Sequence, residues 1–192
     1  MAQLKMIFNA ETVPLPQTEI PAGFHLRSLA ENELELLNGL RLSAGFASWT
    51  PDDLRKLFER ALPNGILLLE DAATGRLAAS ATAAASKLAD HPAHGSLDWV
   101  MTHPDYRGRH LGSAVCALVM RKLYAAGYRT FVLLTDDHRL PAITVYLRLG
   151  WHPWLYQEDM GSRWRAVGEK LNFSFDSLGA LPPDSVFPAR QE

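Results

Sequence analysis

The run from Val100 to Ser113 constrains the fold more than any other part of this 192-residue chain. It reads VMTHPDYRGRHLGS: an apolar, strand-like end, a proline, a short polar turn with two arginines and a glycine, and the start of a helical pattern. A strand that runs through such a turn into a helix presents unpaired backbone N–H groups together with positive charge. The segment therefore predicts a strand–turn–helix unit that holds a phosphate-bearing ligand, such as the pyrophosphate of a nucleotide-type cofactor.

Strand and helix patterns alternate along the rest of the chain, which predicts a mixed α/β sheet covered by helices. The alanine-rich segment 78–85 is interpreted as a strand despite its helical propensity, because it is short, lacks a cap and follows a turn directly after a strand. Strands are expected over 24–29, 65–70, 77–86, 96–102, 131–134 and 151–156, and helices over 31–42, from Thr50 to a stop at Pro63, from Leu111 to a stop at Gly127, over 139–149 and over 162–171.

No shift in composition marks a boundary between domains. Residues 1–22 contain three prolines and are expected to form an extended lead-in, followed by one domain over 23–172 and an irregular tail over 173–192. The 47% hydrophobic and 21% charged residues are typical of a globular protein. With 19 basic and 21 acidic residues, the net charge of −2 gives no general attraction to nucleic acid or an anionic membrane.

The single cysteine, Cys116, excludes an internal disulfide and a zinc site built on several thiolates, and is expected to be a small buried hydrophobe. No apolar run approaches the roughly 18–20 residues that span a bilayer. The first residues lack the features of a signal peptide, so a cytoplasmic location is expected.

A second group of residues, DHRLPAITVYLRLGW over 137–151, lies one helix and one apolar strand after the first. With both groups in this order, the chain resembles the GNAT superfamily of acyl-CoA-dependent N-acetyltransferases over about 23–156. The cofactor pattern [Arg/Gln]-x-x-Gly-x-[Gly/Ala] corresponds to Arg107 through Gly112. The later pattern Asn-x-x-Ala-x-x-[Leu/Val]-Tyr-x-x-x-Gly-[Phe/Trp] is met by Ala142, Val145, Tyr146, Gly150 and Trp151.

This resemblance implies a mixed, largely antiparallel sheet flanked by helices and the transfer of an acetyl group from acetyl-CoA to a primary amine. Two residues depart from the family patterns. His110 stands where glycine is usual, which is acceptable if that residue already lies in the first helical turn, where no positive φ is needed. Arg139 stands where asparagine is common; it either pairs with a phosphate or carboxylate or is a solvated arginine at a helix start.

The resemblance also assigns roles to individual residues. The strand end would offer backbone groups to the pantetheine arm of the cofactor, and one of its N–H groups could stabilise the oxyanion as the amine attacks. The turn would hold the pyrophosphate. The implied cofactor-binding residues are Val100, Met101, Thr102, Arg107, Gly108, Arg109, His110, Leu111, Gly112, Ser113 and Arg139.

Tyr146 is the implied acid for the departing thiolate, with a half-buried core tyrosine as the alternative. The implied base is Asp98, acting through a bound water; a solvent-facing strand aspartate is the equal alternative. His91, His94 and His103 are weaker choices for a base, and His91, His94 and Asp90 are too few to argue for a metal.

Two other functions are also compatible with the sequence. One is a catalytically silent acyl-CoA-binding or regulatory domain. The other is a mononucleotide-binding protein of another α/β fold, although the chain lacks a Gly-x-x-x-x-Gly-Lys-[Ser/Thr] motif. The expected partners are acetyl-CoA, a small amine or peptide acceptor and a second copy of the chain, with no metal. Residues 31–60, 87–94 and those after Tyr156 are expected to read the acceptor, with Phe46, Trp49, Trp154, Trp164, Glu158 and Asp159 among them.

Overall fold

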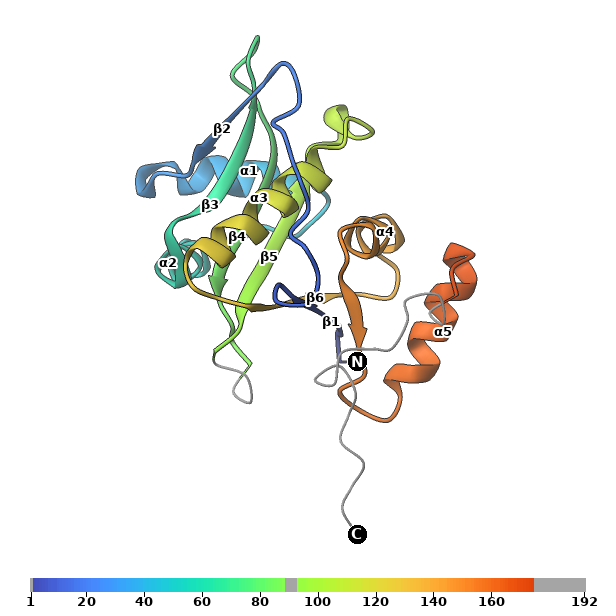
Figure 1. Cartoon of the computed structure of the whole chain (residues 1–192). Helices are drawn as coiled ribbons and strands as arrows, with labels where there is room; N and C mark the ends of the chain where they lie inside the picture. Colours follow the sequence, from blue (N-terminus) through green and yellow to red (C-terminus); the bar gives the residue numbers. More distant parts are fainter. Residues whose placement is uncertain (1, 89–92, 175–192) are drawn as a thin grey trace.

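The strands join in one seven-stranded sheet in the order β2-β3-β4-β5-β6-β1-β7 (Figure 1). The computed structural model describes residues 2–88 and 93–174. Neighbouring strands are antiparallel except β5 and β6, which run parallel, so the expected mixed and largely antiparallel sheet is confirmed. The strands are β1 (Leu4–Asn9), β2 (Phe24–Ser28), β3 (Ala61–Asp71), β4 (Leu77–Ala85), β5 (Gly95–Thr102), β6 (Thr130–Thr135) and β7 (His152–Trp154).

Helices cover both faces of the sheet. In β3, Ile66 and Leu68 pack in one apolar cluster and Leu67 and Leu69 in another, because alternate side chains of a strand point to opposite faces. The cluster with Ile66 and Leu68 includes residues of the two helices between β2 and β3. The other cluster is formed largely by the long helix that follows β5. The helices are α1 (Leu34–Ser43, after a 3₁₀ turn over Glu31–Glu33), α2 (Pro51–Arg60), α3 (Leu111–Ala125, after a 3₁₀ turn over Pro104–Tyr106), α4 (Leu140–Arg148) and α5 (Met160–Leu171).

The N-terminal segment differs from its expectation. Residues 1–22 were expected as a lead-in outside the domain, but Leu4–Asn9 form β1, which pairs with β6 on one side and β7 on the other. Leu4, Met6 and Phe8 are fully buried. The sheet therefore begins well before the expected boundary at residue 23. Of the expected tail over 173–192, residues 175–192 lie outside the described residues.

The helix that begins at Thr50 has the expected start and an earlier end. The Thr50 hydroxyl accepts the Asp53 N–H at 3.2 Å, and Pro51 occupies the first helical position. The helix ends at Arg60 and β3 begins at once, so the expected stop at Pro63 lies within the strand. A register shift between Ala61 and Ile66 accommodates this proline.

The alanine-rich segment is the strand β4, as expected. Ala79, Ala81 and Ala83 are fully buried beneath α3, which small side chains allow to approach the sheet closely. Cys116 on α3 is also fully buried, as expected. Within residues 2–88 and 93–174, none of the helices is long and apolar enough to cross a membrane.

Candidate functional site

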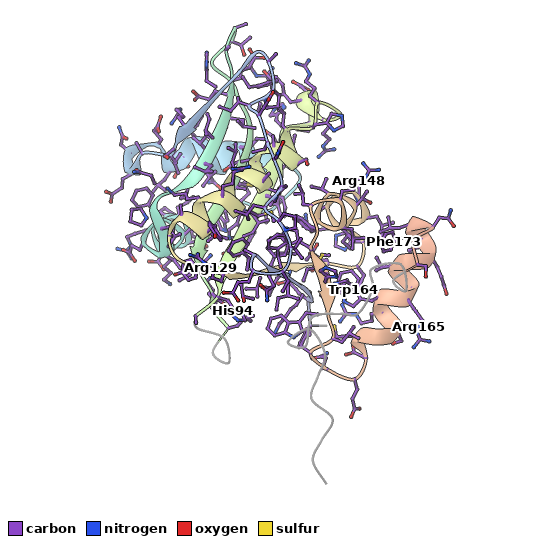
Figure 2. All side chains as sticks on the ribbon, viewed as in Figure 1. His94, Arg129, Arg148, Trp164, Arg165 and Phe173 are labelled. Carbon is purple, nitrogen blue, oxygen red and sulfur yellow. The ribbon has the colours of Figure 1, made fainter. Side chains whose placement is uncertain are left out.

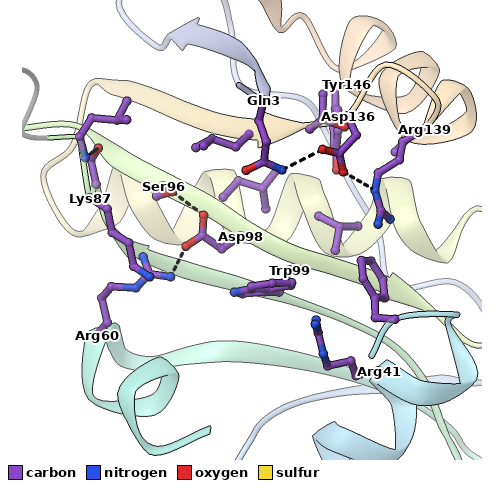
Figure 3. A pocket seen from close by; sticks show the side chains of 18 residues that line it. Gln3, Arg41, Arg60, Lys87, Ser96, Asp98, Trp99, Asp136, Arg139 and Tyr146 are labelled. Atoms are coloured by element: carbon purple, nitrogen blue, oxygen red, sulfur yellow. Dashed lines mark hydrogen bonds and ion pairs between the residues drawn. The ribbon is translucent and has the colours of Figure 1, made fainter. Parts of the chain in front are cut away.

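A pocket opens where β5 and β6 move apart. Register pairs between the two strands join Gly95 with Phe131 and Ser96 with Val132, and in the described chain no later residue of β5 is paired on that side. Leu134 of β6 is consequently 41% exposed, although a fully apolar central strand was expected. The pocket beyond the last pair has a volume of about 440 Å³, with walls from α1, α2, β5, β6 and α4 (Figure 3). A cavity of this size suits a small ligand.

A β-bulge shapes the β5 wall of the pocket. Thr82 pairs with Asp98 and Ser80 with Met101, so β5 carries one more residue than β4 between these pairs. Trp99 within the bulge has a φ of 51° and lines the pocket. A bulge bends its strand and re-aims side chains, which explains how β5 leaves β6. Backbone groups on the β6 side of β5 are thus open to a ligand.

The three β5 residues expected to contact pantetheine do not share one environment. Val100 lines the pocket. Met101 is 2% exposed and packs in the core against α1 and α2. Thr102 pairs with Ala79 of β4, and its hydroxyl lies 3.4 Å from the point where a Cβ on Gly112 would sit. The side chain of Met101 therefore supports the fold, and any contact with a ligand would come from its backbone.

The turn over residues 107–113 joins β5 to α3 with two left-handed residues, Gly108 at a φ of 77° and His110 at a φ of 59°. The Arg107 N–H donates to the Pro104 carbonyl, and the next donor to a backbone carbonyl in this described stretch is the Ala114 N–H. The N–H groups between them are therefore available to an anion at the N-terminus of a 15-residue helix. Leu111 is buried, and Gly112 and Ser113 open the helix.

The expectation for His110 is wrong. Histidine in place of glycine requires no positive φ only if residue 110 lies inside the first helical turn, where φ is negative. It is instead the N-cap residue, with φ 59° and ψ 13°, in the left-handed region where glycine is favoured. Its side chain is exposed and makes no cap hydrogen bond. The turn therefore needs a left-handed residue at this position, and histidine is among the residues that adopt this conformation more often than most.

The arginines of the turn are exposed, and the Arg109 guanidinium lies 5.3 Å from the centre of the Tyr106 ring. Within the described residues, neither Arg107 nor Arg109 forms an ion pair with a carboxylate. Both charges are therefore uncompensated beside the free N–H groups. This is the combination of donors and charge that a pyrophosphate requires.

Tyr146 reaches the pocket from α4. It is 6% exposed, and Ala142, one helical turn earlier, lines the same wall. Burial raises the pKa of the Tyr146 phenol well above its usual value near 10. The hydroxyl therefore keeps its proton at neutral pH, as a general acid must.

Asp98 lies on the β5 wall and is not a solvent-facing aspartate. Its Oδ2 forms an ion pair with Arg60 at the end of α2, and its Oδ1 accepts a hydrogen bond from the Ser96 hydroxyl at 2.6 Å (Figure 3). A carboxylate oxygen has two lone pairs, so each can still accept one further hydrogen bond. The ion pair fixes the position of Asp98 and adds Arg60 to the site.

Arg139 stands at the N-cap of α4 and lines the pocket. Its Nε lies 3.0 Å from Asp136 Oδ2, and its guanidinium lies 4.3 Å from the centre of the Phe46 ring. The side chain is about one third exposed. The arginine is thus part of the pocket wall and not only a solvated residue at a helix start.

The residues expected to read the acceptor separate into two groups. Phe46 lines the pocket, and Trp49 packs against Trp99 with ring centres 4.7 Å apart. Trp154 and Trp164 are core residues that are 4% and 2% exposed, so their expected role is wrong. Figure 2 shows Trp164 on the side of α5 that faces the rest of the chain, while Arg165 points away. Glu158, Asp159, His94 and His103 do not line the pocket, and Asp90 and His91 lie outside the described residues.

Arg41, Arg60 and Trp99 are among the pocket residues that the sequence patterns do not single out, although Arg41 and Arg60 lie within the range 31–60 expected to read the acceptor. Arg41 had one signal in the sequence, because it follows Leu37 by four positions on a helix and so lies on the apolar face of α1. Arg60 and Trp99 had none, since their positions depend on pairing between distant segments.

Comparisons with known proteins agree with this geometry. A sequence model of the acetyltransferase (GNAT) family matches residues 34–151. The chain is 30% identical over 158 residues to a mycothiol acetyltransferase from Pseudarthrobacter chlorophenolicus, covering 78% of this chain and 49% of that protein. It is also 30% identical over 154 residues to a mycothiol acetyltransferase from Thermobispora bispora, covering 74% of this chain and 51% of that protein. The chain thus spans about half the length of the curated relatives it matches.

Solved structures share the fold. A GCN5-related N-acetyltransferase from Sphaerobacter thermophilus has a TM-score of 0.65 at 20% identity, over 80% of this chain and 49% of that chain. The ribosomal-protein-S18-alanine N-acetyltransferase from Escherichia coli has a TM-score of 0.56 at 23% identity, over 66% of this chain and 76% of that chain. At these identities the likeness concerns the arrangement of the backbone.

Proposed function

This chain belongs to the GNAT family of acetyltransferases, and we propose that it transfers the acetyl group of acetyl-CoA to a primary amine. The observation that carries the proposal is the open edge of β5, which has Tyr146 beside it and leads into the turn at the start of α3. Acetyl-CoA needs an anion site for its pyrophosphate, an open backbone edge along which its extended pantetheine arm can lie, and an acid beside the thioester sulfur.

The residues of the turn fit the pyrophosphate of CoA. Free N–H groups between Gly108 and Ser113 provide the donors, and Arg107 and Arg109 provide positive charge. A Cβ at Gly112 would lie 3.4 Å from the Thr102 hydroxyl, so this glycine keeps the start of α3 close to the end of β5. The pantetheine arm carries amide groups, which can pair with the open edge of β5 near Val100 as a further strand would. Whether Arg139 also contacts CoA stays a prediction.

Acetyl-CoA supplies an activated acyl group as a thioester. An open N–H of β5 is available to its carbonyl oxygen, where negative charge develops as the amine attacks. Asp98, held by Arg60 and Ser96, takes a proton from the incoming ammonium group through a water. Tyr146, kept protonated by burial, gives its proton to the departing thiolate.

A direct test is the release of free thiol from acetyl-CoA in the presence of a panel of amines, amino acids and peptides. Turnover with at least one amine, together with stabilisation of the protein by CoA, is the expected result. Stabilisation by CoA without turnover of any amine would favour a silent acyl-CoA-binding domain. The expectations of a cytoplasmic location, of a homodimer and of a reaction without metal, nucleic acid or membrane also stay predictions.

A further inference from the structure

Arg41 occupies an unusual position in the pocket wall opposite α4. It projects from α1, is only 8% exposed, and its guanidinium carbon lies 4.0 Å from the centre of the Trp49 ring, 4.5 Å from that of Trp99 and 5.0 Å from that of Phe46. Three aromatic rings therefore fix this side chain without neutralising its charge.

The charge of Arg41 has no anionic partner within ion-pair distance in the described chain. Its Nε donates to the Ala47 carbonyl, while its Nη1 is buried and has no hydrogen-bond partner in the structure. Burial and the nearby Arg139 lower the pKa of Arg41, and Asp53 acts in the opposite direction with a smaller effect. A buried cation with no anion beside it is costly, so an anion bound in the pocket beside the guanidinium would stabilise it.

The pocket as a whole has an excess of positive charge. Four cationic residues line it, namely Arg41, Arg60, Lys87 and Arg139, against the two carboxylates of Asp98 and Asp136. Both carboxylates are already paired, Asp98 with Arg60 and Asp136 with Arg139. This local balance is opposite in sign to the net charge of −2 of the chain. Figure 3 shows Arg41 and Arg139 entering the pocket from opposite walls.

We propose that the acceptor is a small amine that also carries a carboxylate, and that Arg41 binds this carboxylate. The proposal rests on the proposed function and names the class of acceptor for the same site. A guanidinium fixed by stacking is well suited to a carboxylate, because its planar donors match the two carboxylate oxygens. A cavity of about 440 Å³ that also receives the acyl end of CoA leaves room for an acceptor of amino-acid size.

The kinetic test compares acceptors with and without a carboxylate. Thiol release is measured with each L-amino acid and with its carboxamide, which is neutral at that position. It is also measured with β-alanine, taurine and 2-aminoethylphosphonate, which carry a carboxylate, a sulfonate and a phosphonate, respectively, on the same aminoethyl group. Because hydrogen bonds to charged groups contribute strongly, kcat/KM is expected to be roughly 10- to 100-fold higher for carboxylates than for carboxamides. Equal use of carboxamides, or a preference for the sulfonate or phosphonate, would overturn the proposal.

The variants Arg41→Met and Arg41→Lys assign the effect to Arg41. The preference for carboxylates is expected to vanish in Arg41→Met and to persist in part in Arg41→Lys, which keeps the charge. Arg55→Met, at an exposed arginine on α2 outside the pocket, is the matched control and should change nothing. If Arg41→Met does not fold, Arg41→Lys decides: the same preference as in the unchanged protein would contradict the need for planar donors.

A binding measurement separates this proposal from the proposed function. Thermal stabilisation by N-acetylated amino acids and by their carboxamides is compared in the unchanged protein and in the Arg41 variants. Stabilisation by the carboxylates alone, lost in Arg41→Met, supports the anion site even if no amine is acetylated. Turnover of amines with no difference between carboxylates and carboxamides leaves the acetyltransferase proposal intact and refutes the role of Arg41.

Discussion

The left-handed backbone at His110 gives a prediction that depends on conformation alone. Replacing His110 with glycine should stabilise the protein, because its φ of 59° is strained for a residue with a Cβ and its exposed side chain makes no cap hydrogen bond. The opposite change at Gly108, two residues earlier in the same turn, is the matched control. Gly108 has a φ of 77°, and a Cβ there would meet no atom within 4 Å, so Gly108→Ala adds strain without a clash.

The size of both effects follows from two opposing contributions. A left-handed residue with a Cβ costs about 1–2 kcal/mol. Glycine is more flexible in the unfolded chain, and the entropy it loses on folding offsets about 0.4–1 kcal/mol of the gain from removing this strain. The free energy of unfolding should therefore rise by about 0.5–1 kcal/mol in His110→Gly and fall by a similar amount in Gly108→Ala.

Urea unfolding followed by tryptophan fluorescence measures both changes, since a shift in midpoint at constant slope reports a change in stability. The melting temperature should move by about 1–4 °C, upward for His110→Gly and downward for Gly108→Ala. A loss of stability in His110→Gly would refute the reasoning, because it would mean that the histidine side chain or a helical backbone stabilises the turn.

The remaining predictions concern the pocket and α3. Tyr146→Phe should lower kcat by about 100-fold or more while leaving the affinity for CoA unchanged, measured by thiol release and calorimetry; an unchanged kcat would remove Tyr146 as the acid. Because burial raises the pKa of Tyr146 above its unfolded value of about 10, its contribution to stability is complete below that pH and is lost as the pH rises further, so the urea midpoint should fall above about pH 10 and fall less in Tyr146→Phe. Cys116 is buried and the pKa of its thiol is raised, so it should resist thiol reagents in the folded protein and take up one equivalent of reagent when the protein is unfolded in urea. Rapid reaction in buffer without urea would contradict the packing of α3.

Local patterns in the sequence predicted much of the fold. Periodicity and turn residues lie within a few positions of one another in the segment from Val100 to Ser113, so its strand, turn and helix could be identified without tertiary information. The turn before the alanine-rich segment predicts the strand β4, although alanine favours helices. In these cases each signal acts over the same short range as the structure it specifies.

The features that escaped prediction depend on contacts between distant segments. The bulge at Trp99 arises from the register of β5 against β4, and the ion pair of Arg60 with Asp98 joins residues 38 positions apart. The strand β1 is short and precedes a proline-rich stretch, and only its pairing with β6 and β7 places it inside the sheet. The pocket depends on these long-range contacts. The sequence therefore predicts the pocket residues that belong to local motifs, such as Tyr146, but not most of the other residues that line it.

The central claim is that the turn over 107–113 and the open edge of β5 hold CoA. At CoA concentrations about 100-fold above the dissociation constant, binding should add about 2.7 kcal/mol of stability. This corresponds to a rise in melting temperature of about 5–10 °C for a chain of this length.

The most direct measurement is therefore calorimetric titration of CoA into three proteins: the unchanged chain, Arg107→Glu/Arg109→Glu, and Arg148→Glu/Arg165→Glu. The last variant has the same change in charge at exposed arginines outside the pocket. Binding is expected in the unchanged chain and in Arg148→Glu/Arg165→Glu, with a loss of at least about 100-fold in affinity in Arg107→Glu/Arg109→Glu. No binding to the unchanged chain, or equal affinity in all three, would contradict the account.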